Sequence, residues 1–347
     1  MNGERCPLPL NAYGAITLAH GAGGRLMRQL IAEVFTAAFD PDGRGDRHDG
    51  AVLAVPAGAR LALTTDSYVV YPHFFPGGDI GALAVNGTVN DLAMCGARPA
   101  WLTAGFILEE GLPLDVLRRV AISMRDAAAA AGVRIVTGDT KVVEHGKADG
   151  LFINTTGAGW VRDGVDVRPA RLTPGDAIIV SGDIARHGIA ILAAREEVAF
   201  GGPLVSDCAA LAAPVAALLD AGIDLHVLRD CTRGGLAASL IELAEDGGAE
   251  FDVETAAIPV SEPVRGACEA LGLDPFNVAC EGRFVACVPD ADAARTLVLL
   301  RHYPVSADAA AIGRVTARGP GQVRLRSPYG PVRRLLLPAG EPLPRIC

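Results

Sequence analysis

The sequence predicts a two-domain chain of mixed helices and strands, in the α+β class. Its 347 residues exceed the roughly 100–200 residues of one ordinary domain. Half of the residues are hydrophobic and one fifth are charged, which excludes extensive disorder. Helical and extended patterns occur in both halves but do not alternate strictly, which favours an α+β class over a doubly wound parallel sheet.

Elements of the first half follow from capping and turn residues. Residues 1–15 form a loose N-terminal arm, and the polar stretch 40–50 predicts a surface loop. Asp79 is expected to N-cap a helix that reaches Cys95, because Gly96 suits the C-cap. The remaining expected elements are helices over 25–39 and 113–131, and strands over 60–70, 101–108, 133–136 and 152–159.

A domain boundary is expected near residues 160–175, where a charged, turn-rich stretch precedes a buried strand. In the second half, the segment 327–330 predicts a hairpin turn between the last two strands. We therefore divide the chain into the arm (1–15), an N-terminal domain (16–162), a C-terminal domain (163–337) and a tail (338–347). The expected helices of the second half span 187–196, 206–221 and a segment that ends near 245, and its strands lie near 177–181, 223–228, 283–288, 312–317, 322–326 and 332–337.

Composition excludes several classes of protein. The net charge of −9 argues against a nucleic-acid-binding protein that relies on overall basicity. No run of about 18 apolar residues is present, so we expect no membrane-spanning helix. Residues 6–24 are interrupted by prolines and glycines and lack the features of a signal peptide. Eight cysteines without C-x-x-C spacing indicate reduced thiols and hence a cytoplasmic protein.

Four aspartates stand beside small or polar residues in separate motifs. They are Asp66 in TTDS, Asp91 in VNDL, Asp139 in TGDTK and Asp230 in RDCTRGG. Carboxylates on strand ends and a helix can converge on a hard cation, and Mg²⁺ bound with a polyphosphate takes only one or two of them. For each aspartate alone, the alternative is a strand end or a helix cap.

Two glycine-bearing segments are candidate phosphate sites: His20-Gly-Ala-Gly-Gly24 and Gly138-Asp-Thr-Lys141. Glycines let backbone N–H groups approach an anion, and the start of a helix favours negative charge. Lys141 could pair with a phosphate or act on a substrate. The alternatives are an ordinary flexible turn and an exposed loop lysine, since the chain has no Walker A motif.

The C-terminal tail is the most distinctive local feature. Prolines 338, 342 and 344 disfavour a helix, and ten extended residues reach at most about 30–35 Å. The chain ends at Cys347, whose thiol could be a carrier on a mobile arm. A free thiol is mostly protonated near neutrality, which favours an attachment point loaded by a partner over an activated nucleophile. A frayed tail with an irrelevant cysteine is the alternative.

Six segments together resemble the HypE family of nickel–iron hydrogenase maturation proteins, which are carbamoyl dehydratases. The segments are HGAGG, TTDS, NGTVNDLAMCGARP, GDTKVV, RDCTRGGLA and the terminal PRIC, and the resemblance runs from about residue 15 to residue 347. Two positions depart from the family pattern. Cys231 stands where members usually carry proline, and Cys280 stands where they often carry asparagine.

The HypE family lies in the PurM-like superfamily of ATP-using enzymes, so the resemblance implies a fold and a reaction. It implies an N-terminal sheet that forms a dimeric β-barrel core in a homodimer, a C-terminal α+β sandwich and a flexible tail. The implied reaction is the ATP-dependent dehydration of a carbamoyl group on the Cys347 thiol to a thiocyanate, with ADP and phosphate released. The thiocyanate would supply cyanide to the hydrogenase iron.

The resemblance also implies partners and roles for individual residues. The carbamoyltransferase HypF is the implied donor, and the HypC–HypD iron scaffold is the implied acceptor. ATP and Mg²⁺ are the implied cofactors, and Lys141 and Glu281 are candidates for polarising and deprotonating the carboxamide on Cys347. The implied metal ligands are Asp66, Asp91, Asp139 and Asp230. The implied ATP-binding residues are His20, Gly21, Gly23, Gly24, Asn90, Gly138 and Thr140.

Other readings of the same residues stay open. Selenophosphate synthetase and aminoimidazole ribonucleotide synthetase belong to the same superfamily, but the former usually has a reactive cysteine in its glycine-rich loop, and residues 20–24 contain none. The latter gives no reason for a terminal cysteine. A non-catalytic iron or thiol carrier is a different class, and the scattered Cys and His residues lack chelating spacing. For Glu281 the alternative is a surface-loop carboxylate.

Overall fold

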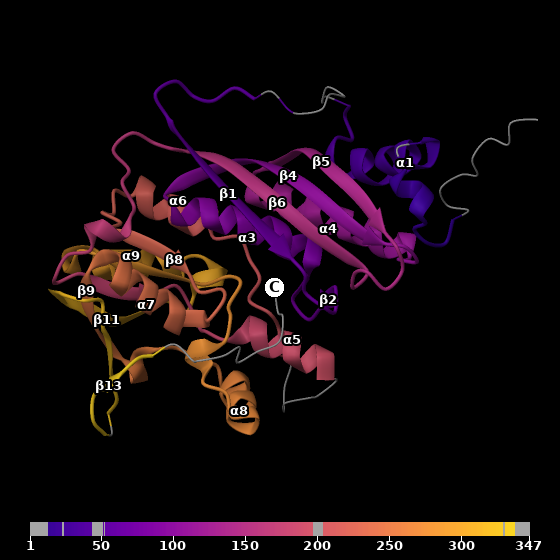
Figure 1. Cartoon of the computed structure of the whole chain (residues 1–347). Helices are drawn as coiled ribbons and strands as arrows, with labels where there is room; N and C mark the ends of the chain where they lie inside the picture. Colours follow the sequence, from indigo (N-terminus) through magenta and orange to yellow (C-terminus); the bar gives the residue numbers. More distant parts are fainter. Residues whose placement is uncertain are drawn as a thin grey trace, which may run out of the picture.

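The computed structural model describes residues 13–22, 24–43, 51, 53–196, 204–328 and 330–336. Two large sheets organise this part of the chain, one in each half of the sequence (Figure 1). A third, two-stranded sheet joins β2 (Phe74–Phe75) and β3 (Gly78–Asp79). Mixed helices and strands in both halves confirm the predicted α+β class. Across the described residues, every helix is too short or too polar to cross a bilayer.

The N-terminal sheet has four strands in the order β1-β6-β4-β5. Strands β4 and β5 are parallel, whereas β6 runs antiparallel to both β1 and β4. One face is covered by helices that share a single hydrophobic core with it (Figure 1). The strands are β1 (Arg60–Tyr68), β4 (Ala97–Glu109), β5 (Arg134–Val143) and β6 (Leu151–Val161), and the covering helices are α1 (Arg25–Leu30), a π-helical turn (Ile31–Thr36), α2 (Ala37–Phe39), α3 (Ile80–Met94) and α4 (Leu114–Ala131).

Local capping explains the long helices of this domain. The Asp79 carboxylate accepts hydrogen bonds from the backbone N–H groups of Gly81 and Ala82, which confirms it as the N-cap of α3. The same carboxylate accepts a 2.6 Å bond from the Ser123 hydroxyl on α4, so the cap also ties the two helices together. Helix α4 ends at Gly132, whose φ of 70° is in the left-handed region that glycine tolerates best.

The C-terminal sheet has seven strands in the order β13-β12-β9-β11-β7-β10-β8. Alternate residues of its central strand β7 face different cores: Ile178 and Val180 pack with α7, whereas Ile179 packs with α6. The sheet is therefore covered on both faces. Its strands are β7 (Ala177–Val180), β8 (Val227–Asp230), β9 (Ala249–Glu254), β10 (Phe284–Val288), β11 (Ala310–Arg318), β12 (Val323–Arg326) and β13 (Arg333–Arg334), and the helices are α5 (Arg186–Glu196), α6 (Ala212–Asp220), α7 (Gly235–Gly247), α8 (Glu262–Leu271) and α9 (Asp290–Arg301).

One predicted helix is wrong at its start. The sequence predicts a helix over 206–221, but α6 begins at Ala212 and the residues before it form no helix. We call residues 204–211 the connector. Its backbone binds groups of the N-terminal domain, because the Ser206 N–H donates to the Pro76 carbonyl and the Leu211 N–H donates to the Asn90 side chain. These bonds replace those of the expected first helical turns. The sequence analysis did not predict β9, α8 or α9.

The N-terminal sheet is open in the single chain. Strands β1 and β5 lie at its two edges and do not pair with each other, so the described residues contain no closed barrel. No described helix covers the second face of this sheet, where Leu61, Leu63 and Ile107 are 54%, 65% and 44% exposed. A tilted pair of rings, Trp101 and Trp160, lies on the same face.

Candidate active site

A cleft of about 900 Å³ lies between the two sheets, with walls from both domains. Strand β1 and helix α3 of the N-terminal domain form one wall. Strand β8, the turn that follows it and the segment 277–281 form the other wall. Four acidic residues line this cleft, namely Asp66, Asp91, Asp230 and Glu281. The structure thus brings three of the four predicted metal ligands together with one predicted catalytic residue.

Each acidic residue is placed by a different element. Asp66 lies on β1 and Asp91 on α3, and the Thr64 hydroxyl donates a 2.7 Å hydrogen bond from β1 to the Asp91 carboxylate. Asp230 is the last residue of β8, and Glu281 lies in the loop that leads into β10. Glu281 is only 4% exposed, so its alternative as a surface-loop carboxylate is wrong.

Burial and mutual repulsion make three acidic groups of this cleft, those of Asp91, Asp230 and Glu281, hard to ionise. Burial, followed by the charges of Asp91 and Asp66, raises the pKa of Asp230 from 3.8 to about 7. Burial and the neighbouring carboxylates, Asp230 first among them, also hold the pKa of Glu281 well above its usual range. The pKa of Asp91 is raised by burial, partly offset by the Thr64 hydrogen bond. A cation entering the cleft would relieve this repulsion.

The cleft does not hold a complete metal site made of protein ligands alone. In the portion of the chain that the structure describes, no three His, Cys, Asp or Glu side chains are grouped closely enough to hold a metal ion. This arrangement fits a metal ion that arrives with a polyphosphate, because such an ion takes one or two carboxylates and fills its remaining positions with phosphate oxygens and water.

The Asn90 amide joins the two domains. Its Oδ1 accepts a 2.7 Å hydrogen bond from the Leu211 N–H of the connector, and its Nδ2 donates to the Ala209 carbonyl at 3.0 Å and more weakly to the Glu281 carbonyl at 3.5 Å. Asn90 is 2% exposed and does not line the cleft. Its amide therefore positions the residues around the cleft, next to Asp91, rather than reaching into it.

Asp139 and Lys141 lie away from the cleft. They form an exposed ion pair on β5, with Lys141 Nζ 2.7 Å from Asp139 Oδ2, and this contact lowers the pKa of Asp139. Strand β5 is at the opposite edge of the sheet from β1, three strand spacings or about 14 Å away. Both side chains point to the open face, whereas Thr64 bonds to α3 on the covered face. Within one chain, the predicted site residues are therefore split between two places.

The glycine-rich segment packs beside β5 and not beside the acidic cleft. A Cβ atom on Gly21 would lie 2.8 Å from Val142 Cβ, so the close approach of this turn to β5 requires glycine. His20 is fully buried, its Nδ1 accepts a 3.0 Å hydrogen bond from the Thr17 N–H, and its Nε2 has no partner in the described structure. Gly24 is the N-cap of α1.

Strand geometry accounts for two further predicted residues on β5. A Cβ atom on Gly138 would lie 2.3 Å from the Ala104 carbonyl oxygen, so glycine is needed where β5 approaches β4. Thr140 is 5% exposed and faces the helices. Gly23 and Cys347 lie outside the described residues, as do the tail and most of the N-terminal arm.

Sequence reasoning missed several residues at the cleft. Arg229 and Arg233 line it beside Asp230. Their positive charges offset part of the rise in the pKa of Asp91 that burial causes. Their signal was present, because both flank Asp230 in the RDCTRGG motif. Two further buried charged residues, Asp207 and Arg283, lie next to Glu281 but do not line the cleft. No local pattern marks Asp207, because it falls in the segment that the sequence assigns to a helix.

Comparison with known proteins places this geometry in a family. Residues 47–161 match the N-terminal domain model of the AIR synthase related proteins, and residues 173–326 match the C-terminal domain model. The carbamoyl dehydratase HypE of Rhodobacter capsulatus is 52% identical over 334 residues, which are 96% of this chain and 98% of that protein.

Solved structures agree with this assignment. A hydrogenase maturation protein HypE in complex with ATP superposes with a TM-score of 0.91 at 46% identity, covering 95% of this chain and 99% of that one. A HypE–HypF complex superposes with a TM-score of 0.78 at 41% identity, covering 91% of this chain and 100% of that one. The chain has the PurM-like two-domain fold and belongs to the HypE family of carbamoyl dehydratases.

Proposed function

We propose that this protein uses ATP to dehydrate a carbamoyl group carried on the Cys347 sulfur, giving a thiocyanate that supplies cyanide for the iron of a nickel–iron hydrogenase. The observation that carries the proposal is the cleft between the domains, in which Asp66, Asp91, Asp230 and Glu281 converge. The chain's 46% identity to a HypE that binds ATP supports a nucleotide as the occupant of this cleft.

The chemistry explains why ATP is needed. An amide does not lose oxide, so the γ-phosphoryl group moves to the amide oxygen, and its bond to ADP breaks as the new P–O bond forms. The C–O bond then breaks and phosphate leaves, while both N–H protons are removed and S–C≡N remains. The products are thiocyanate, ADP, phosphate and one proton. Glu281 and Lys141 are our candidates for moving these protons and polarising the carboxamide.

The residues of the cleft fit Mg²⁺ with a nucleotide. Hard carboxylate oxygens are the ligands that Mg²⁺ prefers, and Asp66, Asp91 and Asp230 would hold it directly or through water. When bound, Mg²⁺ neutralises the phosphate oxygens. Asp139 of β5 would likewise hold the metal or the nucleotide, and the backbone of Thr140 and of residues 20–24 would position phosphates. Burial and the repulsion of neighbouring carboxylates raise the pKa of Asp230, and a bound cation would offset that repulsion.

The split of the site supports a homodimer with composite active sites. Lys141 and Asp139 lie on the open sheet face, at the edge opposite Asp66, so they complete the cleft only if they come from a second copy. The exposed Leu61 and Leu63 on the same open face would be buried by that copy. Two open sheets packed in this way form the dimeric β-barrel core that the family resemblance implies.

Partners and compartment follow from the same chemistry. HypF would load the carbamoyl group onto Cys347, which the solved HypE–HypF complex of a 41% identical relative supports. The HypC–HypD scaffold would accept the cyanide. We place the reaction in the cytoplasm, where free thiols persist, and all six cysteines within the described residues are free. The 338–347 tail would carry the substrate from donor to cleft to acceptor.

Mass spectrometry of the C-terminal peptide tests this function. The full chain is loaded by the carbamoyltransferase and then given ATP and Mg²⁺. We expect Cys347 to gain one cyano group in place of its hydrogen, with one ADP formed for each group. Cys347→Ala should form none, whereas Cys268→Ala, which removes a buried thiol on α8 away from the cleft, should behave as the wild type. A carbamoyl group that persists unchanged with ATP would contradict the proposal.

A further inference from the structure

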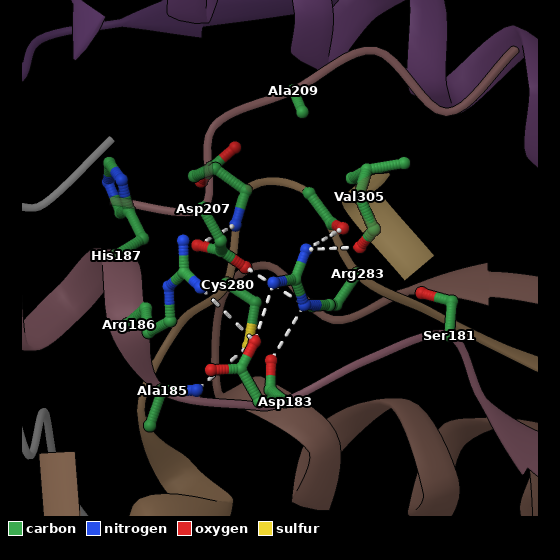
Figure 2. Close-up of polar contacts among 12 residues, drawn as sticks. Ser181, Asp183, Ala185, Arg186, His187, Asp207, Ala209, Cys280, Arg283 and Val305 are labelled. Carbon is green, nitrogen blue, oxygen red and sulfur yellow. Dashed lines mark hydrogen bonds and ion pairs between the residues drawn. The ribbon is translucent and has the colours of Figure 1, made fainter. Parts of the chain in front are cut away.

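A buried cluster of charged groups, drawn in Figure 2, contacts the backbone of Glu281 through Asp207. Its members are Asp183, Asp207 and Arg283, each 5% exposed or less. None of the three lines the cleft, which Glu281 does. Taking charges out of water costs several kcal/mol per ion, and apolar replacements are often as stable. A cluster of this kind behind a site residue therefore points to a role in fixing geometry.

The Arg283 guanidinium binds several separate segments. Its Nε donates to the Asp183 carbonyl at 2.7 Å, and its Nη2 donates to the Asp183 carboxylate at 2.6 Å. Its Nη1 donates to the carbonyls of Gly282 at 2.7 Å and Val305 at 3.0 Å. Figure 2 shows Arg283 between the two aspartates. The guanidinium thus ties the loop of Glu281 to the loop after β7 and to the 3-10 turn Pro304–Ser306 that follows α9.

Asp207 is the link from this cluster to Glu281. Its Oδ1 accepts a 3.2 Å hydrogen bond from the Glu281 N–H, and its Oδ2 lies 3.8 Å from Arg283 Nε with no hydrogen-bond partner in the described structure. The connector that carries Asp207 also binds the backbone carbonyl of Glu281, because the Ala209 N–H donates to it at 3.4 Å. Both backbone groups of Glu281 are therefore held by the connector.

Tight packing leaves this contact little freedom. A Cβ atom on Gly282 would lie 2.0 Å from the Asp207 carbonyl oxygen, and one on Gly182 would lie 2.7 Å from Arg283 Nε. The connector and the loop of Glu281 therefore touch backbone to backbone, and the backbone of the loop after β7 packs against the Arg283 side chain. Because four carboxylates share the cleft, repulsion acts to push Glu281 away from its neighbours, and this packing opposes that displacement.

We propose that Asp207 and Arg283 are positioning residues that fix the carboxyl group of Glu281 in the cleft. Asp207 acts on Glu281 by accepting a hydrogen bond from the Glu281 backbone N–H. Arg283 acts by holding Asp207, the loop of Glu281 and the loop after β7 in one arrangement. Neither residue reaches the reacting atoms. This inference rests on the proposed function, because it assigns Glu281 to the chemical step. A misplacement of about 1 Å at a group that acts on the substrate can cost about 100-fold in rate.

The test compares single-turnover thiocyanate formation and the KM for ATP among variants of the full chain. Asp207→Ala removes the acceptor for the Glu281 N–H, and we expect turnover to fall about 10- to 100-fold with the KM for ATP within about threefold of wild type. Asp207→Asn keeps an acceptor oxygen, so it should restore turnover to within about threefold of wild type. The matched control is Asp176→Ala, since Asp176 is 3% exposed and also accepts a backbone N–H, from Thr173.

A second pair of variants keeps the proposal testable if Asp207→Ala does not fold. Arg283→Lys retains the charge but loses the planar guanidinium that donates to several groups at once. Turnover should therefore fall about tenfold at an unchanged KM for ATP. Arg301→Lys is its control, because Arg301 also donates through Nε and Nη2, both to the Ala309 carbonyl, but lies on α9 away from the cleft. Turnover in Asp207→Ala or Arg283→Lys no lower than in its control would overturn the proposal. Thiocyanate absent from wild type and controls alike would instead count against the proposed function.

Discussion

Lys141 Nζ lies 2.7 Å from Asp139 Oδ2 on a strand at the far edge of the sheet from Asp66. This ion pair is exposed on the open face of the N-terminal sheet, whereas Glu281 is buried in the cleft between the domains. A single chain therefore cannot assemble the two candidate groups for the carboxamide. The proposed pairing of two chains is the physical basis of the first two predictions.

Mixing two inactive variants should restore activity if the site is composite. Lys141→Ala and Glu281→Gln should each abolish thiocyanate formation alone. In a mixed dimer, one of the two sites receives Glu281 from one copy and Lys141 from the other. After subunit exchange at equal concentration, about a quarter of all sites should be intact, and the rate should recover accordingly. A mixture that stays as inactive as its components would contradict a site shared between copies.

Leu63→Asp should dissociate the proposed dimer. Leu63 is 65% exposed on the open sheet face, and a carboxylate there would be buried without a partner in the pair. Light scattering after size-exclusion chromatography should give the mass of one chain, and thiocyanate formation should be lost. Leu271→Asp, at a 45% exposed position on α8, provides the control and should stay dimeric. The prediction fails if Leu63→Asp keeps the mass of the wild type.

Asp230 should make the ligand-free protein less stable as the pH rises. Its pKa is raised in the folded state from 3.8 to about 7, so the folded protein keeps a proton that the unfolded chain has lost. Its contribution is present below pH 4 and is lost as the pH rises from about 4 to about 7. Urea denaturation of wild type and Asp230→Asn should show that the substitution stabilises the protein more at pH 8 than at pH 5. An equal effect of the substitution at the two pH values would exclude the ionisation of Asp230 as a source of pH-dependent stability.

Asn90→Ala should loosen the contact between the domains. It removes an amide that bonds to Leu211 and Ala209 and leaves a buried N–H and a buried carbonyl without their partner. We expect the free energy of unfolding to fall by about 1–3 kcal/mol. Asn86→Ala is the control one helical turn earlier, because the Asn86 amide lies 3.6 Å from the Cys208 sulfur, which is a weak contact. Equal losses in the two variants would show that Asn90 has no special role.

Features set by neighbouring residues could be predicted from the sequence. Asp79 caps α3, and Gly132 ends α4 in a left-handed conformation, because capping depends on a few adjacent positions. The motifs around Asp66, Asp91 and Asp230 likewise identified three residues that share one cleft. In each case the signal lies within a short segment.

Features set by distant contacts could not be predicted in the same way. The alanine-rich segment 206–221 favours a helix locally, yet the connector is not helical because its backbone bonds to Pro76 and Asn90. The separation of Lys141 from Glu281 depends on strand order, which no local pattern determines. Asp207 was missed for the same reason, since its partners are 74 residues away or more along the chain.

The fate of the carbamoyl oxygen tests the central claim most directly. The full chain is loaded with a carbamoyl group labelled with ¹⁸O and given unlabelled ATP and Mg²⁺ in unlabelled water. If the γ-phosphoryl group is transferred to the amide oxygen, the released inorganic phosphate should carry one ¹⁸O atom for each thiocyanate formed. Unlabelled phosphate, with the ¹⁸O in water or still on the protein, would contradict the account.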